Sequence, residues 1–269
     1  MRFPGSAKTG IWIKMKALIL AAGTGTRLTG PDDTGRPKSL LSFGGETLLA
    51  RHIRSLRALE IEQLVIVVGY NADQIRGEVS AGGADDFVRF IDNPRFREGS
   101  VISMWSARAA LTDGGDWLFM DADVLYDPAI LERMVASDTA TCFPYDSSFG
   151  DGEEPVKFCL KGGRPVEFRK AIGDVAYDDI GEWVGFIRMG PEFCAALADR
   201  TGAYVSESPT PEPYEEAVRD LILGDFNDRV GAVDIAGLAW IEIDFPQDLI
   251  RAEQDILPRI GKPQYGTPQ

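Results

Sequence analysis

The segment Lys16–Leu41, KALILAAGTGTRLTGPDDTGRPKSLL, gives the clearest indication of how this chain folds. It begins with the apolar run Ala17–Ala22, which predicts a parallel strand because such strands are buried on both faces. The turn Gly23-Thr24-Gly25-Thr26 follows directly, and its small residues let backbone N–H groups approach an anion closely. Arg27 and Lys38 add two cations that can reach the same phosphates. The stretch therefore predicts a cradle for a triphosphate.

Other glycine-rich loops fit this stretch less well. The dinucleotide-binding fingerprint needs a third glycine where Leu28 stands and an acidic residue about 20 positions further on. Ser42–Gly45 offers no such acid. A Walker-type loop needs a Gly-Lys-Ser/Thr sequence that is missing at the required spacing. A plain strand-to-helix turn remains as an alternative, and the spacing to Arg27 and Lys38 argues against it.

The same residues carry a resemblance. Leu20–Leu28 (LAAGTGTRL), followed by Pro37–Leu41 (PKSLL), resembles the opening of the nucleotidyltransferases that activate sugar phosphates and alcohol phosphates. The resemblance implies a Rossmann-like, GT-A-type α/β fold, with a mixed, mostly parallel sheet flanked by helices and a small β-hairpin subregion for the acceptor. It implies that Arg27 and Lys38 neutralise the phosphates of a nucleoside triphosphate. The residues that would contact this nucleotide are Leu20, Ala21, Ala22, Gly23, Thr24, Gly25 and Thr26.

Composition limits the classes of protein that this chain can belong to. The chain has 269 residues, of which 44% are hydrophobic, enough for a full core. Its net charge of −14 argues against binding to nucleic acid or to an anionic membrane. Residues 1–60 contain 10 Lys/Arg and 4 Asp/Glu, a net charge of +6, so the remainder carries −20. The cationic part suits phosphates, and the acidic part suits metal ions or a cationic acceptor.

The cysteines and the apolar runs bear on the cell compartment. Cys142, Cys159 and Cys194 lie far apart, which fits buried thiols in a reducing cytoplasm rather than a disulfide framework. No apolar run approaches the ~20 residues of a membrane span, and residues 1–14 lack the apolar core of a signal peptide. We therefore expect a cytoplasmic protein, and we allow for a homodimer.

The alternation of patterns along the chain predicts a single nucleotidyltransferase domain over residues 15–260. Residues 15–145 would form its nucleotide-binding half, residues 146–260 its acceptor-binding half with the second metal aspartate, and residues 1–14 and 261–269 the tails. Strands and helices should alternate and place the site at the C-terminal ends of the strands. The main predicted elements are helices over 46–60, 191–199 and 214–223, strands over 64–69, 87–91, 117–120 and 182–189, a hairpin over 156–168, and a loop over 201–213 that would act as a lid.

Carboxylates follow two apolar strands. Asp121 and Asp123 end the fourth strand, and Glu242 and Asp244 end the last one. Acids at the end of a buried strand need compensation, and hard carboxylate oxygens suit Mg²⁺. Both pairs resemble the family's metal site, which implies that Asp123 and Asp244 are the principal ligands, with Asp121 and Glu242 beside them. We interpret Asp248, near the start of the last helix, as a first-turn acid that interacts with the helix dipole.

Gly99-Ser100 opens a helix. In the resembling family, a glycine and a hydroxyl or amide at this place contact the base and ribose, and Ala122 is implied in the same site. An ordinary N-cap explains Ser100 equally well. Lys157, on the first arm of the hairpin, either points toward phosphate in the cleft or is a charge on an edge strand. Related enzymes often place a second lysine there, which favours the cleft.

The acceptor is inferred from a narrower resemblance. Within the family, the chain length and the ending Trp240–Asp244 (WIEID) look most like the cytidylyltransferases for phosphocholine or 2-aminoethylphosphonate. A cationic head group binds to aromatic faces and carboxylates. Trp105 and Trp183 are alternatively core residues, as such aromatics usually are. The candidates for this pocket are Trp105, Asp179, Glu182, Trp183, Tyr214 and Glu215.

The predicted activity is a Mg²⁺-dependent nucleotidyl transfer, with CMP passing from CTP to a small phosphate or phosphonate acceptor and pyrophosphate released. Such an acceptor is already an anion, so no general base is required, which fits a chain whose single histidine, His52, lies on a packing helix. Arg27, Lys38 and Lys157 would supply the catalytic cations. The alternatives are a sugar 1-phosphate or inositol phosphate acceptor, and, in another class, a non-catalytic nucleotide-binding regulatory protein.

Overall fold

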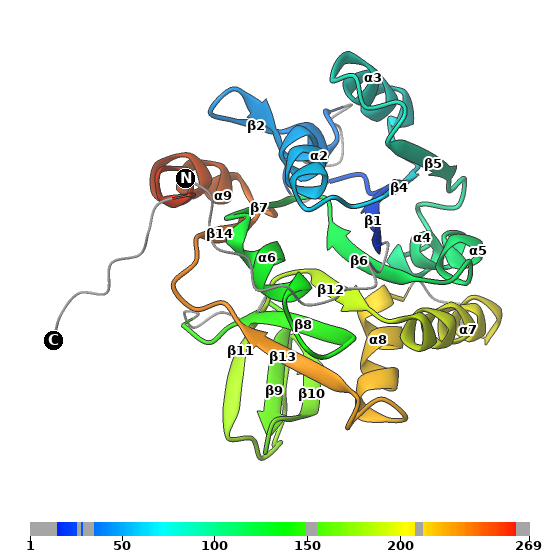
Figure 1. Ribbon diagram of the computed structural model, residues 1–269, viewed down its shortest axis with the longest axis vertical. Helices are drawn as coiled ribbons and strands as arrows, with labels where there is room; N and C mark the ends of the chain where they lie inside the picture. The colour runs from blue at the N-terminus through cyan, green and yellow to red at the C-terminus, as the bar shows by residue number, and fades with distance from the viewer. Residues whose placement is uncertain (1–14, 26–27, 29–34, 149–154, 208–211, 262–269) are drawn as a thin grey trace, which may run out of the picture.

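The computed structural model describes residues 15–25, 28, 35–148, 155–207 and 212–261 of the chain. The strands of its main sheet are β1 (Met15–Ala21), β4 (Leu64–Val68), β5 (Val88–Asp92), β6 (Asp116–Asp121), β8 (Thr141–Asp146), β9 (Lys157–Lys161), β10 (Arg164–Arg169), β11 (Asp179–Trp183), β12 (Phe186–Met189) and β13 (Val230–Asp234). Within the described residues they form one mixed sheet in the order β10-β9-β11-β8-β12-β6-β1-β4-β5, and β13 pairs with β8 (Figure 1). A two-stranded hairpin, β2 (Ser42–Phe43) and β3 (Glu46–Thr47), stands apart from this sheet.

Helices cover both faces of the sheet, which confirms the predicted fold class. They are α2 (Leu48–Ala58), α3 (Ala72–Ala81), α4 (Ser100–Ser106), α5 (Arg108–Leu111), α6 (Ala129–Val135), α7 (Pro191–Glu207) and α8 (Tyr214–Leu223). Helices α2, α3 and α6 share one core cluster with Ile19 of β1, while α4, α5, α7 and α8 share another with Leu18. Because successive strand residues face opposite sides, this burial on both faces explains the continuous apolar run of β1.

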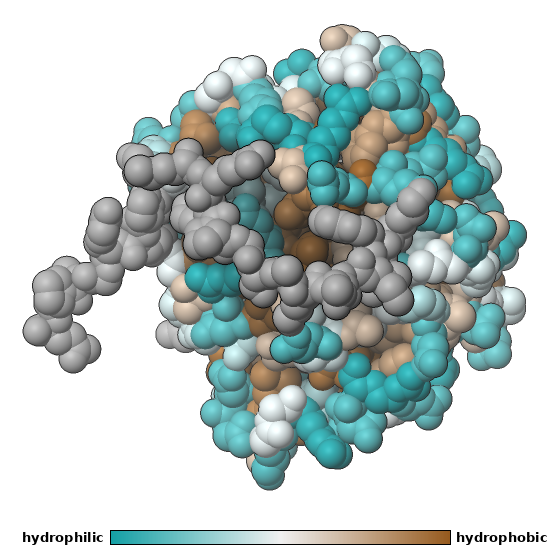
Figure 2. Space-filling view, viewed as in Figure 1, coloured by the Kyte–Doolittle hydropathy of each residue, from teal (hydrophilic) through white to brown (hydrophobic). Residues whose placement is uncertain are grey.

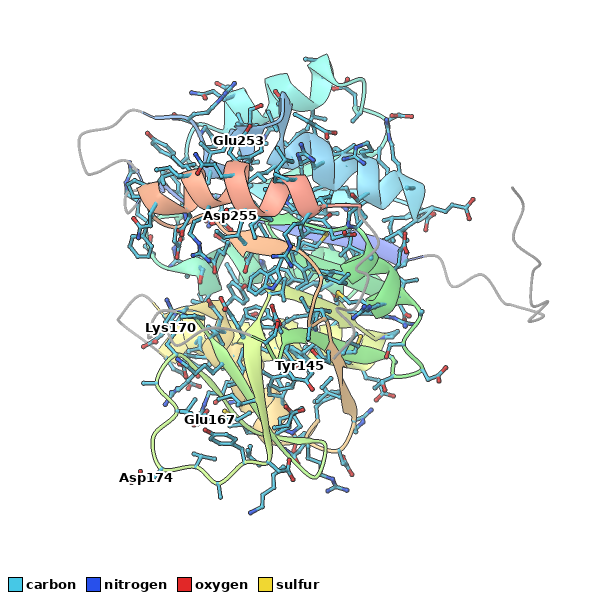
Figure 3. The ribbon with its side chains drawn as sticks, turned by 90° about the vertical axis from the view of Figure 1, so that its left-hand side faces the viewer. Tyr145, Glu167, Lys170, Asp174, Glu253 and Asp255 are labelled. Atoms are coloured by element: carbon cyan, nitrogen blue, oxygen red, sulfur yellow. The ribbon has the colours of Figure 1, made fainter. Side chains whose placement is uncertain are left out.

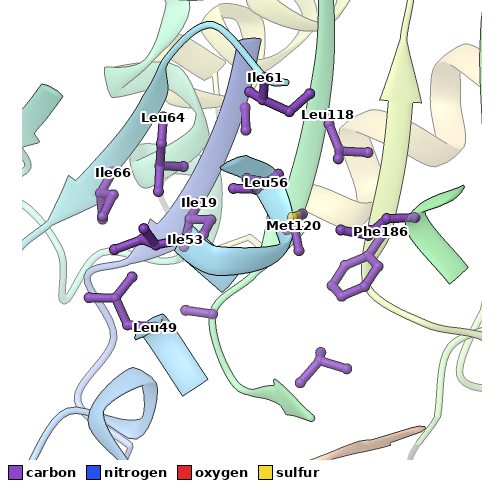
Figure 4. Close-up of a cluster of buried hydrophobic side chains, with 14 of the residues drawn as sticks. Ile19, Leu49, Ile53, Leu56, Ile61, Leu64, Ile66, Leu118, Met120 and Phe186 are labelled. Carbon is purple, nitrogen blue, oxygen red and sulfur yellow. The ribbon is translucent and has the colours of Figure 1, made fainter. Parts of the chain in front are cut away.

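The half of the sheet built around β1 is parallel. β1 pairs with β4 and β6, so Ile19 lies between Ile66 and Met120. Figure 4 shows Ile53 and Leu56 of α2 packed over these strands. The C-terminal ends of β1 and β6 therefore lie side by side, at the edge of the sheet where α/β proteins bind their ligands.

The other half of the sheet is mostly antiparallel, although β13 runs parallel to β8. β12 runs antiparallel to both β6 and β8, and β11 runs antiparallel to β8 and β9. β9 and β10 form the predicted hairpin, whose turn at Gly162-Gly163 has φ values of +57° and +75°. Such left-handed backbone favours glycine. The hairpin extends the sheet away from β1, where the sequence predicted a subregion for the acceptor.

The C-terminal segment returns to the ends of the parallel strands. β7 (Val124–Tyr126), which follows β6, pairs antiparallel with β14 (Trp240–Glu242). α9 (Pro246–Arg251) follows, and its Asp248 accepts hydrogen bonds from the backbone N–H groups of Asp244 and Phe245 over 3.1 and 2.8 Å. Short helical turns over Ala252–Ile256 and Leu257–Arg259 complete the segment. Asp248 thus has the first-turn position that the sequence predicted.

Two predicted elements differ from the structure. The strand expected over 182–189 is divided between β11 and β12, because the chain turns at Gly185, where φ is +84°. A Cβ at Gly185 would lie 2.7 Å from Oδ2 of Asp121, so only glycine fits here without displacing that carboxylate. Helix α7 continues to Glu207, so the predicted loop is wrong for 201–207. Residues 208–211 of the expected lid lie outside the described residues.

The described part of the chain contains no helix that is both long and apolar enough to span a membrane. Hydrophilic side chains cover most of the face shown in Figure 2, and hydrophobic ones are visible mainly near its centre.

Candidate active site

Three carboxylates from distant parts of the chain meet at the C-terminal end of β6. Asp123 lies in the turn between β6 and β7, and Glu242 and Asp244 lie at the end of β14. The pairing of β7 with β14 brings them together, and the backbone N–H of Ile243 donates to the carbonyl oxygen of Asp123 over 3.0 Å. One oxygen from each of Asp123, Glu242 and Asp244 lies within 4.8 Å of the others. This set of hard oxygen ligands fits a divalent cation.

Lys38 lies against this carboxylate cluster. It begins a short 3₁₀ helix (Lys38–Leu40), and its Nζ donates to Oδ2 of Asp123 over 3.0 Å and to Oδ1 of Asp244 over 2.5 Å. Its side chain is only 14% exposed. Burial alone lowers the pKa of Lys38, but Asp123 and Asp244 outweigh that effect and raise it, so the ammonium stays charged. The sequence predicted Lys38 and both aspartates for one site, and the structure brings them together.

The glycine-rich turn lies beside Lys38. Gly25 has a φ of +68°, and a Cβ there would lie 3.3 Å from Cγ of Lys38. A Cβ at Gly23 would meet no atom of the described residues within 4 Å. The backbone of Ala22 is fixed by a hydrogen bond from the N–H of Tyr70, 3.1 Å long. Thr26 and Arg27, the remaining predicted residues of this turn, lie outside the described residues.

Burial and repulsion among the neighbouring carboxylates raise the pKa values of two of them. Burial, and then the charges of Asp123 and Asp244, raise the pKa of Glu242 to about 8, although part of its side chain is exposed. Burial and the charge of Asp123 also raise the pKa of Asp121 well above its usual range. A bound cation would offset this repulsion between ionised carboxylates.

Tyr214, at the start of α8, connects two predicted parts of the site. Its hydroxyl donates to Oδ2 of Asp121 over 2.7 Å, and its backbone N–H donates to Oγ of Ser100 over 3.0 Å. The predicted N-cap role of Ser100 is wrong, because Gly99 is the N-cap of α4 and the Ser100 hydroxyl accepts from α8 instead. Its predicted contact with base and ribose stays a prediction.

The structure favours the core alternative for Trp183, and Tyr214 is buried beside it. Both are buried, and their rings pack edge to face with centroids 6.3 Å apart. The indole N–H of Trp183 donates to the carbonyl of Phe186 over 2.9 Å, so its polar atom is satisfied inside the protein. Trp105 is half-buried on α4, and the guanidinium of Arg108 lies 3.7 Å from the centre of its ring. These three aromatics therefore do not line the pocket described next.

An open pocket of about 540 Å³ adjoins the carboxylate cluster. Its walls come from the antiparallel half of the sheet and from the C-terminal segment. In Figure 3 the C-terminal segment, with Glu253 and Asp255, lies above the antiparallel half, with Tyr145 and Glu167. The side chains that line it include Asp146, Glu182, Trp240, Glu242, Asp244 and Arg251.

The family to which the chain belongs follows from its match to known sequences. The model of the MobA-like NTP transferase domain matches residues 17–179, more than half of the chain. The chain belongs to this family. The matched region includes the glycine-rich turn, Lys38 and Asp123, so the predicted nucleotidyltransferase family is confirmed.

Individual relatives agree with this family membership. The chain is 30% identical over 254 residues to a bifunctional IPC transferase and DIPP synthase from Rubrobacter xylanophilus, a match that covers 90% of the chain and 52% of that protein. It is also 30% identical over 255 residues to a CMP-5'-(3-aminopropyl)phosphonate synthase from Streptomyces rubellomurinus, covering 90% of the chain and 38% of that protein. The chain thus spans about half or less of the length of these relatives.

The fold also matches that of a solved structure. A CTP:phosphocholine cytidylyltransferase from Streptococcus pneumoniae superposes with a TM-score of 0.67 at 21% identity, covering 90% of the chain and 98% of that protein. At this identity the likeness concerns the fold. It agrees with the arrangement of sheet and helices described above.

In this MobA-like NTP transferase, the other predicted acceptor residues are dispersed. Asp179 accepts a hydrogen bond from the hydroxyl of Tyr145 over 2.6 Å. Glu215, in the first turn of α8, contributes to the raised pKa values of Asp121 and Glu242, so it faces the carboxylate cluster. Glu182 alone of the six predicted acceptor residues lines the pocket.

Lys157 does not lie on an edge strand, so that alternative is wrong. β9 is flanked by β10 and β11, and Lys157 is opposite Glu182 in the register of β9 and β11. Its ammonium donates to the carbonyl oxygen of Lys170 over 3.1 Å. The predicted phosphate contact of Lys157 stays a prediction, and its place beside Glu182 puts it next to the pocket wall.

The sequence did not identify Asp146, Trp240 and Arg251 as site residues. Trp240 lies two residues before Glu242, and this spacing on β14 was the available signal, since such residues share one face of a strand. Its indole N–H donates to Oδ2 of Asp146 over 2.9 Å. Asp146 is opposite Glu182 in the pairing of β8 with β11, a relation that depends on tertiary structure alone.

His52, which the sequence placed on a packing helix, is fully buried. Its Nδ1 lies 3.4 Å from the Tyr126 hydroxyl and its Nε2 lies 3.4 Å from the carbonyl oxygen of Ala122. Burial lowers the pKa of His52 to about 4, so the ring is neutral. It supports the turn that contains Ala122 and Asp123 and is not accessible to a substrate.

Proposed function

We propose that this MobA-like NTP transferase is a Mg²⁺-dependent cytidylyltransferase. It would transfer CMP from CTP to a small acceptor that bears a phosphate or phosphonate and an amine, such as phosphocholine or 2-aminoethylphosphonate, and release pyrophosphate. The observation that carries this proposal is the position of Lys38, between Asp123 and Asp244 and beside a pocket with Glu182 and Trp240 in its wall.

The reaction forms one bond and breaks another at the same phosphorus. An oxygen of the acceptor phosphate or phosphonate attacks the α-phosphorus of CTP, and the bond to the bridging oxygen of pyrophosphate breaks as the new P–O–P link forms. The attacking oxygen is already an anion at neutral pH, so no proton has to be removed. Catalysis by positioning and charge cancellation therefore suffices, and the inaccessible His52 is not needed as a base.

The chain's own groups can supply that cancellation. Lys38 lies within reach of both the glycine-rich turn and the carboxylate cluster, so its ammonium can neutralise charge on the α-phosphate as it develops. The backbone from Ala22 to Gly25 would bind the outer phosphates, and Arg27 would add a cation there. Asp123 and Asp244, with Glu242 beside them, would hold Mg²⁺, which neutralises phosphate charge when bound.

Three pocket residues support an amine on the acceptor. Burial together with the charge of Asp146 raises the pKa of Glu182 to about 7, although Arg251 and Lys157 act against this rise. A cationic group placed beside these two carboxylates would relieve their repulsion. Trp240 adds an aromatic ring to the same wall, and such rings attract quaternary and primary ammonium groups. The similarity to a CMP-5'-(3-aminopropyl)phosphonate synthase, named for a phosphonate with an aminopropyl group, also supports an amine on the acceptor.

An inositol phosphate is a second candidate for the acceptor. It is favoured by the 30% identity, over 90% of this chain, to a bifunctional IPC transferase and DIPP synthase. An acceptor of this type has hydroxyl groups and no cation, so Glu182 and Asp146 would accept hydrogen bonds from it.

The experiment that tests the function is pyrophosphate release with Mg²⁺, with CTP, UTP, GTP, ATP and dTTP each combined with a panel of acceptors. The panel contains phosphocholine, 2-aminoethylphosphonate, phosphoethanolamine, inositol 1-phosphate and glucose 1-phosphate. We expect turnover with CTP and an amine-bearing acceptor. Turnover only with inositol 1-phosphate or glucose 1-phosphate would refute the proposal that the acceptor bears an amine. Nucleotide binding without any turnover would indicate a non-catalytic regulatory protein.

A further inference from the structure

The ammonium of Lys38 lies where a cation shared by the carboxylate cluster would lie. It is within hydrogen-bonding distance of both Asp123 and Asp244, at 3.0 and 2.5 Å, and these two side chains are only 20% and 13% exposed. Asp123, Asp244 and Glu242 also offer the oxygens that approach one another within 4.8 Å. The lysine therefore binds to two of the three carboxylates that could hold a divalent metal.

An ammonium and a divalent cation that share these carboxylates weaken each other's binding. Each hydrogen bond from Nζ uses a carboxylate lone pair, and two like charges a few ångströms apart repel strongly where water is largely excluded. Metal binding to Asp123 and Asp244 is therefore more favourable when the Lys38 ammonium moves away. The two cations compete for one site.

Lys38 has both the freedom to move and a second place to bind. Its backbone is held in the 3₁₀ helix, whose Leu40 N–H donates to the carbonyl of Pro37 over 2.8 Å, while four rotatable carbons separate that backbone from Nζ. Its Cγ passes beside Gly25, in the turn that would bind phosphates. An ammonium at this position can exchange a carboxylate partner for a phosphate partner without any change in the fold.

We propose that Lys38 is an internal counter-ion that weakens metal binding to the free protein and yields its place when a nucleoside triphosphate binds. The phosphates attract the ammonium, and the released aspartates then bind the metal that arrives with the nucleotide. This inference rests on the proposed function for the nucleotide, while the competition itself concerns only Lys38, Asp123 and Asp244. Metal binding and nucleotide binding are then positively coupled: each ligand increases the affinity of the protein for the other by the same factor.

The competition can be tested with Mn²⁺ alone. Free Mn²⁺ is measured by electron paramagnetic resonance during titration of the full chain, without nucleotide, for the wild type, Lys38→Met and Lys38→Gln. We expect the neutral variants to bind Mn²⁺ about tenfold more tightly, a typical size for coupling between two sites. Lys16→Met is the matched control, because it also removes one ammonium from one aspartate, Asp113, at a distance of 2.9 Å on the protein surface. It should leave Mn²⁺ affinity unchanged.

A second readout keeps the test decisive if the variants are less stable. Without Lys38, the two aspartates repel each other, so we expect the Tm of Lys38→Gln to fall in EDTA and to recover in Mn²⁺ more than that of the wild type. Equal Mn²⁺ affinities in folded wild type and Lys38 variants, or an equal rise of Tm on adding Mn²⁺, would overturn the proposal.

The nucleotide arm separates this inference from the proposed function. Mn²⁺ affinity is measured again with CTP, after correction for Mn²⁺ bound to free CTP. We expect CTP to tighten Mn²⁺ binding to the wild type and to do so less in Lys38→Met. If none of the five nucleoside triphosphates binds to the wild type, the proposed function fails, whereas the titration with Mn²⁺ alone still decides whether Lys38 competes with the metal.

Discussion

The hydroxyl of Tyr214 donates a 2.7 Å hydrogen bond to Oδ2 of Asp121, a buried carboxyl at the end of β6. Burial and the neighbouring Asp123 raise the pKa of this carboxyl, and the hydrogen bond from Tyr214 acts in the opposite direction. The backbone of Tyr214 is also held in place, because its N–H donates a hydrogen bond to Oγ of Ser100 in α4. Helix α8 is thereby fixed to the strand that leads to the carboxylate cluster.

Replacement of Tyr214 by phenylalanine should destabilise the protein. The variant removes the hydroxyl and leaves Asp121 with one partner fewer, and loss of a partner to a buried polar group costs about 1–3 kcal/mol. The free energy of unfolding in urea measures the effect. Tyr204→Phe is the matched control, since its hydroxyl bonds Asp220 over 2.9 Å between α7 and α8 at a more accessible place. If both variants lose the same small amount of unfolding free energy, the hydrogen bond from Tyr214 to Asp121 does not stabilise the protein.

Replacement of Gly25 by alanine should impair turnover more than folding. The added Cβ would lie 3.3 Å from Cγ of Lys38 and would displace that side chain, while the positive φ costs roughly 1–2 kcal/mol for a residue with a Cβ. Displacement of a catalytic group by about 1 Å can cost ~100-fold in rate, and the shift required here is only a few tenths of an ångström, so we expect a smaller loss. Gly45→Ala is the control, because φ is +82° and a Cβ there would meet nothing within 4 Å. The steady-state rates of the two variants are compared at equal folded fraction. Equal rates would show that the contact between Gly25 and Lys38 does not matter for turnover.

Lys38→Ala and Asp123→Asn should each reduce pyrophosphate release by at least about 100-fold, since each removes a charge that the transition state needs. Both residues lie at the cleft rather than in the hydrophobic core, so circular dichroism should show folded proteins. Lys16→Ala removes a lysine from a surface pair and should keep its activity. Near-normal turnover in either cleft variant would exclude the assigned site.

The residues that could be predicted were those whose role depends on local sequence. The apolar run of β1, the turn at Gly25 and the acids that end β6 and β14 each follow from a few adjacent residues, and the resemblance connected them. The pairing of Asp123 with Asp244 was also expected, because both follow buried strands. Their actual contact depends on the antiparallel pairing of β7 with β14.

The acceptor side could not be predicted in the same way. Asp146 and Glu182 face each other only because β8 and β11 are neighbours, although 35 positions separate them along the chain. The resemblance suggested Trp183 as a ligand for a cation, yet Trp183 is buried against Tyr214 of α8. Aromatic residues serve the core and a pocket equally well, and tertiary structure decides between the two uses.

The pH dependence of acceptor binding should report on Glu182. Burial and then Asp146 raise the pKa of its carboxyl to about 7, whereas Arg251 and Lys157 act against this rise. Below this value Glu182 is mostly neutral, and above it the carboxylate is charged and attracts a cation.

The KM for phosphocholine, whose quaternary ammonium keeps its charge at every pH, should therefore fall as the pH rises through about 7. A group with this pKa is roughly 10% ionised at pH 6 and about 90% at pH 8, so the fall should approach tenfold. Glu182→Gln removes the titrating group and should give a KM that is high and changes little with pH, apart from the titration of the acceptor phosphate common to both proteins. A KM with the same pH profile in both proteins would show that Glu182 does not contact the ammonium, and the pocket would then suit an uncharged acceptor such as an inositol phosphate.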